Sequence, residues 1–145
     1  MIESIMKRIA ENKRHGDADI RIVPKDWGQE IWIVNSERQN YCGKLLQINK
    51  GWSASLHYHG RKDETFFLYQ GLLFMEHPRN EWVMYPGNVQ RIRPGQTHRF
   101  TALEDSVIVE FSTHHHDSDT TRLEVGRRVD IGKLDIPYRR GKKKY

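Results

Sequence analysis

Short hydrophobic segments separated by polar turn residues run along most of this chain. Side chains alternate between the two faces of a strand, so such segments predict a succession of short strands. Turn signals every 8–12 residues or so favour a barrel or a sandwich. Besides the stretch around residues 51–71, the predicted strands cover residues 20–23, 31–34, 41–49, 72–75, 82–85, 88–93, 99–102 and 106–112. We expect Pro24 to end the first of them.

The N-terminal segment has a different period. Ile2, Ile5, Met6 and Ile9 recur at helical spacing, which predicts an amphipathic helix through His15. Gly16 is placed to end it. We expect this helix to pack outside the β domain or on a second subunit. The chain then divides into a helix and lead-in (1–19), one β domain (20–136) and a basic tail (137–145).

Residues 51–71, GWSASLHYHGRKDETFFLYQG, contain the clearest chemical pattern. His57 and His59 are two residues apart, so in a strand they share a face. A turn at residues 60–63 would bring Glu64, at the start of the next strand, beside them. Two imidazoles and a carboxylate suit Zn, Mn, Fe, Co or Ni, and His98 is the candidate fourth ligand. The alternative is a surface hairpin with incidental histidines.

The same spacing carries a family resemblance. Gly51, five residues, His57, one residue, His59, four residues, Glu64, six residues and Gly71 resemble the first motif of the cupin superfamily. Gly87, Gly95 and His98 have the separations of the second motif. Its proline is displaced to Pro94, and Ala102 replaces its asparagine. The resemblance implies an all-β, single-domain jelly-roll barrel whose four ligands hold one divalent metal ion in its interior.

A longer stretch is similar to the cupin domain of type II mannose-6-phosphate isomerases. The order Asp26-Trp27-Gly28, Gly43-Lys44, HYHGRKDETF, EFST, DSDTTRLE and Gly126-Arg127 carries this similarity. Asp119 and Arg122 fit an Asp-Asp-x-x-Arg-like segment of that family, whose other acid is missing here. The resemblance implies aldose-ketose isomerisation of a sugar or sugar phosphate.

Two residues are candidates for the proton chemistry of such a reaction. Glu110 is our candidate base. It lies on the predicted last strand, on the opposite face from Val107, Val109 and Phe111. The alternative places Glu110 in solvent and those apolar residues inside. Lys44, which shares a face with apolar residues, either extends to solvent or enters the cavity to stabilise an enediolate oxygen.

Other residues are candidates for binding substrate. Arg61 and Arg122 are candidates to hold a phosphate or acidic sugar group. Trp27 either stacks on a sugar ring or packs in the core. We interpret residues 114–116, three consecutive histidines, as a polar loop at the cavity mouth, with the alternative that one of them lines the cavity.

Two further functional classes stay open at this point. The same ligand set suits an Fe(II)-dependent cupin oxygenase, because sequence does not choose the metal. A non-catalytic cupin that only binds a sugar would also retain these residues. Replacing the candidate base and lysine would separate the last class from an enzyme, since binding would survive.

Composition narrows the possible partners. The net charge is +5, but residues 139–144 alone supply five positive charges, so residues 1–138 are neutral overall. The sequence therefore does not favour nucleic-acid binding. There is no apolar run of about 20 residues, which excludes a membrane-spanning helix. Cys42 is the only cysteine, consistent with a reducing compartment. We expect a cytoplasmic homodimer acting on a small molecule.

Overall fold

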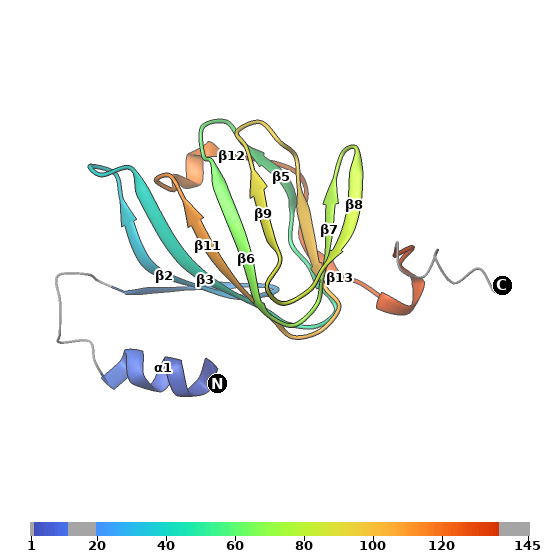
Figure 1. Cartoon of the computed structure of the whole chain (residues 1–145), viewed down its shortest axis with the longest axis horizontal. Coiled ribbons are helices and arrows are strands. Elements are labelled where there is room, and N and C mark those ends of the chain that lie inside the picture. Colours follow the sequence, from blue (N-terminus) through green and yellow to red (C-terminus); the bar gives the residue numbers. More distant parts are fainter. Residues whose placement is uncertain (1, 12–19, 137–145) are drawn as a thin grey trace.

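The computed structural model describes residues 2–11 and 20–136, in which strands predominate over a single short helix (Figure 1). The helix is α1 (Ile2–Glu11). The strands are β1 (Arg21–Lys25), β2 (Gly28–Ser36), β3 (Tyr41–Ile48), β4 (Trp52–Ser53), β5 (Leu56–His59), β6 (Glu64–Gln70), β7 (Leu73–His77), β8 (Asn80–Met84), β9 (Val89–Ile92), β10 (Arg99–Ala102), β11 (Ser106–Ser112), β12 (Thr120–Glu124) and β13 (Arg127–Arg128). Two short 3₁₀ helices, η1 (Asp117–Asp119) and η2 (Ile131–Lys133), follow β11 and β13.

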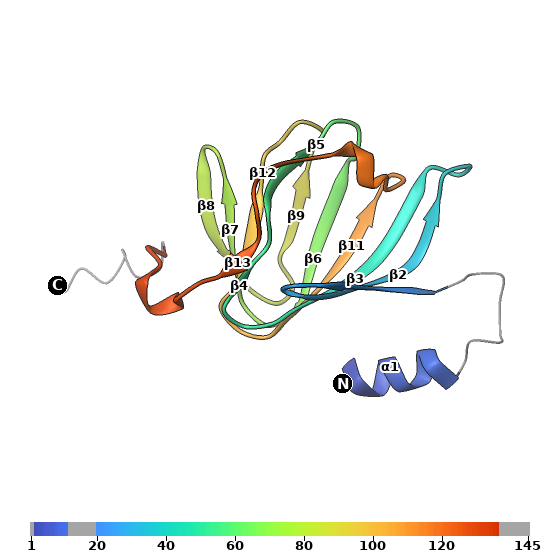
Figure 2. The ribbon, with the colours of Figure 1, turned by 180° about the vertical axis from the view of Figure 1, so that it is seen from behind.

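The strands form three antiparallel sheets. The largest has the order β1-β2-β3-β11-β6-β9, the second β13-β4-β10-β7-β8, and the third pairs β12 with β5. The two larger sheets form opposing layers, which both views of the ribbon show (Figures 1 and 2). Hydrogen bonds between the described strands do not close these sheets into a ring. The predicted all-β fold is confirmed, whereas the closed barrel is not.

The hydrophobic core lies between these two layers. Leu46, Leu68 and Ile108 come from central strands of the six-stranded sheet, and Met75 and Phe100 come from the opposing sheet. All five side chains are buried. The alternation along β3, β6 and β11 turns alternate side chains toward the interior, as the sequence pattern predicted, although Val107 on the other face of β11 is buried as well. At β11 the buried set contains Ile108 and Glu110, whereas Phe111 is 60% exposed.

Three details of the strands differ from prediction. Pro24 does not end β1 but lies within it opposite Gln29, which is possible because β1 is an edge strand. A register shift between Trp32 and Val34 leaves Ile33 42% exposed, so the alternation in β2 is interrupted. Strands β12 and β13 were not predicted at all, because their sequence has no alternating apolar pattern.

The residues around the histidine motif do not form a hairpin. Strand β5 pairs with β12, whereas β6 pairs with β11 and β9. The turn at residues 60–63 therefore passes from one sheet to another. The turn still brings Glu64 close to the histidines. They meet in the interior between the sheets and not as neighbours on two paired strands.

The N-terminal helix α1 ends at Glu11, and the predicted cap at Gly16 lies outside the described residues, as does the basic tail. Within the described part of the chain, no helix is long and apolar enough to span a membrane.

Gly71 and Gly87 provide a matched test of backbone requirements in this fold. Both have left-handed φ values, 96° and 91°. A Cβ at Gly71 would collide with Ser106 Oγ and with the Asp105 carbonyl, whereas a Cβ at Gly87 would meet no atom within 4 Å. An alanine at either position would therefore have the same strained φ, but only an alanine at Gly71 would collide with neighbouring atoms.

We expect Gly87→Ala to lower the free energy of unfolding by about 1 kcal/mol, the cost of left-handed φ for a residue with a Cβ. Gly71→Ala should lower it by a further 1–3 kcal/mol or so because of the overpacking. Urea unfolding of the two variants measures the difference. Equal losses would show that the strand packing around Ser106 accommodates the methyl group.

Candidate metal centre

Four side chains from three parts of the chain converge between the layers. His57 and His59 lie on β5, Glu64 begins β6, and His98 immediately precedes β10. Their candidate ligand atoms all lie within 4.8 Å of one another. Paired backbone hydrogen bonds fix His57 opposite His98, with N···O distances of 3.1 and 2.9 Å. The structure thus brings together all four residues that the sequence motif selected.

The hydrogen bonds of the imidazoles orient them toward a common centre. His57 Nδ1 lies 2.9 Å from the Ser55 carbonyl, and His98 Nδ1 lies 2.9 Å from the Gln96 carbonyl. A carbonyl oxygen accepts only, so Nδ1 must donate in both rings, which leaves Nε2 with a lone pair. Such outer partners characteristically fix the tautomer of metal-binding histidines. His59 Nδ1 contacts the hydroxyl of Thr120 at 3.2 Å.

The facing atoms of Glu64 and His98 are not satisfied by each other. Glu64 Oε1 and His98 Nε2 are 2.9 Å apart, yet both are buried without an aligned hydrogen bond. With Nδ1 of His98 donating, a neutral ring leaves Nε2 without a proton, so two electron-rich atoms lie 2.9 Å apart, which is repulsive. Either a proton on Nε2 or a metal ion removes the repulsion. Since His57 and His59 converge on the same point, this donor set fits a divalent metal.

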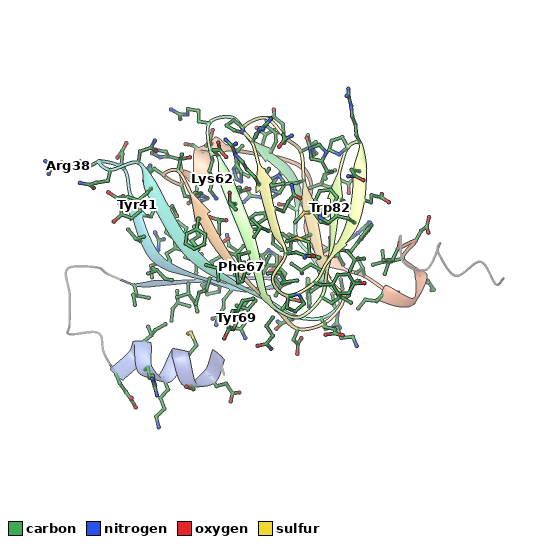
Figure 3. The ribbon with its side chains drawn as sticks, viewed as in Figure 1. Arg38, Tyr41, Lys62, Phe67, Tyr69 and Trp82 are labelled. Atoms are coloured by element: carbon green, nitrogen blue, oxygen red, sulfur yellow. The ribbon has the colours of Figure 1, made fainter. Side chains whose placement is uncertain are left out.

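A buried lysine that sequence reasoning missed connects the metal centre to the candidate base. Lys62 Nζ lies 2.8 Å from Glu64 Oε2 and 2.9 Å from Glu110 Oε2. All three side chains are at most 5% exposed. Figure 3 shows Lys62 near the upper end of β6. No local pattern marks Lys62, because Glu110 is 48 residues away in the sequence.

These charges shift one another's pKa values. Burial raises the pKa of Glu64, but Lys62 and His98 outweigh it and hold that pKa well below its usual range. Burial lowers the pKa of Lys62, but Glu110 and Glu64 raise it above that of a free lysine. Burial raises the pKa of Glu110, and Lys62 offsets this only in part. The two carboxylates therefore differ, with Glu110 the more easily protonated.

A second buried lysine lies on β3, the strand that pairs with β11. Lys44 is 1% exposed, so it enters the interior and does not extend to solvent. Its Nζ lies 3.2 Å from Glu30 Oε2 and 4.2 Å from the centre of the Trp32 ring. Trp32 Nε1 also donates to Glu30, at 2.7 Å. Burial raises the pKa of Glu30, but Lys44 and Lys25 bring it below its usual value.

These groups face a cavity of about 270 Å³. Its lining includes the proposed base and lysine, Glu110 and Lys44, together with Trp27 and Arg122. Trp27 packs edge-on against Phe100 and is only 9% exposed, so most of its ring belongs to the core. Arg122 is an exposed residue of β12, paired with His57.

Arg61 and the histidine loop differ in their relation to this cavity. Arg61 does not line it: its side chain is 80% exposed and extends toward Asp119. Of the three consecutive histidines, His115 lines the cavity, whereas His114 and His116 face another pocket. The alternation within a short extended loop explains this division.

The fold is a two-layer β structure, and its interior holds a group of side chains able to bind a metal. No protein-family model and no curated protein sequence matches the chain. Solved structures do match its fold. KdgF from Halomonas sp. is 19% identical with a TM-score of 0.61, over 74% of this chain and 94% of that one. An RmlC-like cupin from Shewanella frigidimarina is 12% identical with a TM-score of 0.60, over 69% and 88%.

Two larger proteins contain a similar unit. A variant of oxalate decarboxylase from Bacillus subtilis is 16% identical with a TM-score of 0.61, over 72% of this chain and 30% of that one. The capsular polysaccharide assembling protein CapF from Staphylococcus aureus is 19% identical with a TM-score of 0.60, over 77% and 33%. The chain therefore spans about a third of each. These similarities confirm the predicted cupin fold.

The buried histidines predict a pH dependence for the metal-free protein. Burial, and then the neighbouring His98, lower the pKa of His57 to about 3. Burial also lowers the pKa values of His59 and His115 to about 4. These histidines of the unfolded chain take up protons near pH 6.5, whereas those of the folded chain do not. The free energy of unfolding therefore keeps its full value above about pH 6.5 and decreases below it.

We expect unfolding in the presence of a chelator to become easier from about pH 7 to about pH 5, by up to 2 kcal/mol or so per histidine. Urea titrations at both pH values measure this loss. The double variant His57→Asn/His59→Asn should show a smaller loss. An equal loss in this variant would place the acid sensitivity elsewhere.

The charge network predicts that Lys62→Met strongly lowers the free energy of unfolding. Removing the lysine leaves two carboxylates buried without their shared cation, which should cost about 3–5 kcal/mol in metal-free protein. Lys25→Met is the control, because Lys25 is partly exposed and lies 3.5 Å from Glu30. It should cost less than about 1 kcal/mol. Similar losses in both variants would show that burial adds nothing to the lysine's contribution.

Proposed function

We propose that this protein is a metal-dependent cupin enzyme that isomerises a sugar or sugar phosphate between its aldose and ketose forms. The observation that carries the proposal is the buried, unsatisfied pair Glu64 and His98 beside two further histidines, next to a cavity containing Glu110 and Lys44. A fold similarity to a capsular polysaccharide assembling protein supports carbohydrate as the substrate class.

In this proposal His57, His59, Glu64 and His98 hold a single divalent ion, with Zn, Mn, Fe, Co and Ni all compatible with the donor set. Such an ion, when bound, polarises the substrate carbonyl as a Lewis acid. The histidines remain neutral and oriented by their Nδ1 hydrogen bonds. Lys62 holds the second oxygen of Glu64, so that Oε1 stays directed at the centre.

Glu110 is the proposed base. Its Oε2 accepts a hydrogen bond from Lys62, which leaves Oε1 for the substrate. It takes the proton from the carbon beside the carbonyl and returns it to the former carbonyl carbon, while the hydroxyl proton of the first carbon passes to the former carbonyl oxygen, so no proton is gained or lost overall. The pKa of Glu110, raised by burial, makes it a stronger base than an exposed carboxylate.

The remaining cavity residues would position the substrate. Lys44 would donate a hydrogen bond to the enediolate oxygen that forms during proton transfer. Arg122, at the mouth, would hold a phosphate or acidic group. Trp27 would offer the part of its ring that faces the cavity to the apolar side of a sugar. Arg61 has no part in this proposal because it points away from the cavity.

A second candidate is a metal-dependent oxidative or decarboxylating cupin. The similarity in fold to oxalate decarboxylase and the three-histidine, one-carboxylate ligand set favour it. The two candidates use the same centre but differ in their need for Glu110. A cavity lined by so many charged side chains suits a polar substrate in either reaction.

The first test is metal content. Elemental analysis should find one equivalent of metal more in wild type than in His57→Ala or in Glu64→Ala. The metal-loaded protein is then incubated in D₂O with a panel of aldoses and sugar phosphates, and NMR follows deuterium incorporation beside the carbonyl. Glu110→Gln should reduce exchange about 10²-fold or more while retaining metal.

Glu104→Gln replaces an exposed carboxylate and serves as the control. Exchange that survives Glu110→Gln would remove Glu110 as the base. Metal binding with no exchange on any sugar, but with oxygen uptake or CO₂ release, would favour the second candidate. Binding of a sugar without turnover would leave a sugar-binding cupin.

A further inference from the structure

A second group of potential metal ligands lies outside the cavity. His114 and His116 follow β11, and Glu37 occupies the turn between β2 and β3. Their candidate ligand atoms lie within 4.8 Å of one another. His114 Nδ1 is 2.9 Å from His116 Nε2, and that same nitrogen of His116 is 3.8 Å from Glu37 Oε1. We propose that these three residues form a second, surface site for a borderline transition-metal ion, Zn²⁺ or Cu²⁺.

The chain pattern explains why only two of the three consecutive histidines take part. Alternate residues of the loop face the same side, so His114 and His116 meet while His115 turns to the inner cavity. His115 is instead paired with Asp117, at 3.0 Å. The three consecutive histidines are therefore divided between the outer pocket and the inner cavity.

Hydrogen bonds between the two segments hold the ligands in place before any metal binds. The Asn40 side-chain oxygen accepts from the backbone N–H of His114 at 3.1 Å. The Asn35 side chain makes two bonds to the backbone of His115, at 2.8 and 3.0 Å. The hairpin turn that carries Glu37 is thereby fastened to the loop that carries both imidazoles. A preorganised site loses less conformational entropy on binding.

The chemistry of the group favours a metal ion over other ligands. Two imidazole nitrogens and a carboxylate suit zinc and copper. In the metal-free state the facing nitrogens share one proton, which moves to the far nitrogen of its own ring when both lone pairs are needed. Tetrahedral zinc would require the nitrogens to separate to about 3.3 Å, a small movement. Glu37 is 77% exposed and free to approach.

The surrounding pocket has a suitable charge. Its volume is about 250 Å³, and its lining adds Asn40, Arg61, Thr113 and Asp119 to the three ligands. Arg61 lies 3.8 Å from Asp119, so its positive charge is balanced. Glu37 then leaves the pocket with one net negative charge. An ion bound here would clamp the hairpin to the loop whose His115 forms part of the inner cavity wall.

The test is a zinc titration of tag-free, metal-depleted full-length protein, with stoichiometry read by calorimetry. We expect two equivalents in wild type and one in His114→Asn/His116→Asn. Glu37→Gln should weaken the second equivalent. His115→Asn is the matched control, because it removes the adjacent histidine and should leave the outer equivalent unchanged. Circular dichroism verifies that each variant is folded.

The outcomes separate this site from the inner one. One equivalent in wild type that is lost in the double variant would support the surface site and contradict the inner metal centre. An equal number of equivalents in wild type and in the double variant would overturn the surface site. With Cu²⁺, the electron paramagnetic resonance spectrum with imidazole nitrogen coupling should lose one component in the double variant and keep the component of the inner centre, and a spectrum identical to that of wild type would also overturn the proposal.

Discussion

The buried carboxylate of Glu64 is the group on which the interior of this protein depends. An ionised carboxylate without partners inside a protein is too costly to persist, so each of its oxygens must face a positive or donating group. Oε2 meets Lys62, and Oε1 meets the centre where three histidines converge. The position of Glu64 at the start of β6, a strand between β11 and β9, fixes this arrangement in the sheet.

The turn before Glu64 is held by a residue far along the chain. Asp119 accepts hydrogen bonds from the backbone N–H groups of Arg61 and Lys62, at 3.0 Å in each case. This anchor sets the direction in which the Lys62 side chain enters the interior. Sequence similarity had matched Asp119 to a functional segment of a family, and the structure gives it a local role as a support for the charge network.

The sequence predicted the parts of the structure that local spacing controls. The limits of β10 and β11 agree with prediction, and the period-2 placement of His57 and His59 correctly selected the face they share. Sequence did not predict what distant segments create. The link between Lys62 and Glu110 spans 48 residues, and β12 becomes a strand through its pairing with β5. Likewise, only the tertiary structure shows that His115 faces the cavity while its neighbours do not.

The charges of the cavity lining connect its geometry to the kind of substrate it would attract. Its lysines and arginine number four and its carboxylates five, so the ionised lining carries one net negative charge. A divalent cation held by the inner ligands would reverse the sign to one net positive charge. The exposed Arg122, one of these four cations, would contribute to a field that favours anions. For the proposed isomerase, occupancy of the metal centre would therefore influence both the polarisation of a carbonyl and the binding of a phosphorylated or acidic sugar, which makes a neutral sugar the weaker candidate.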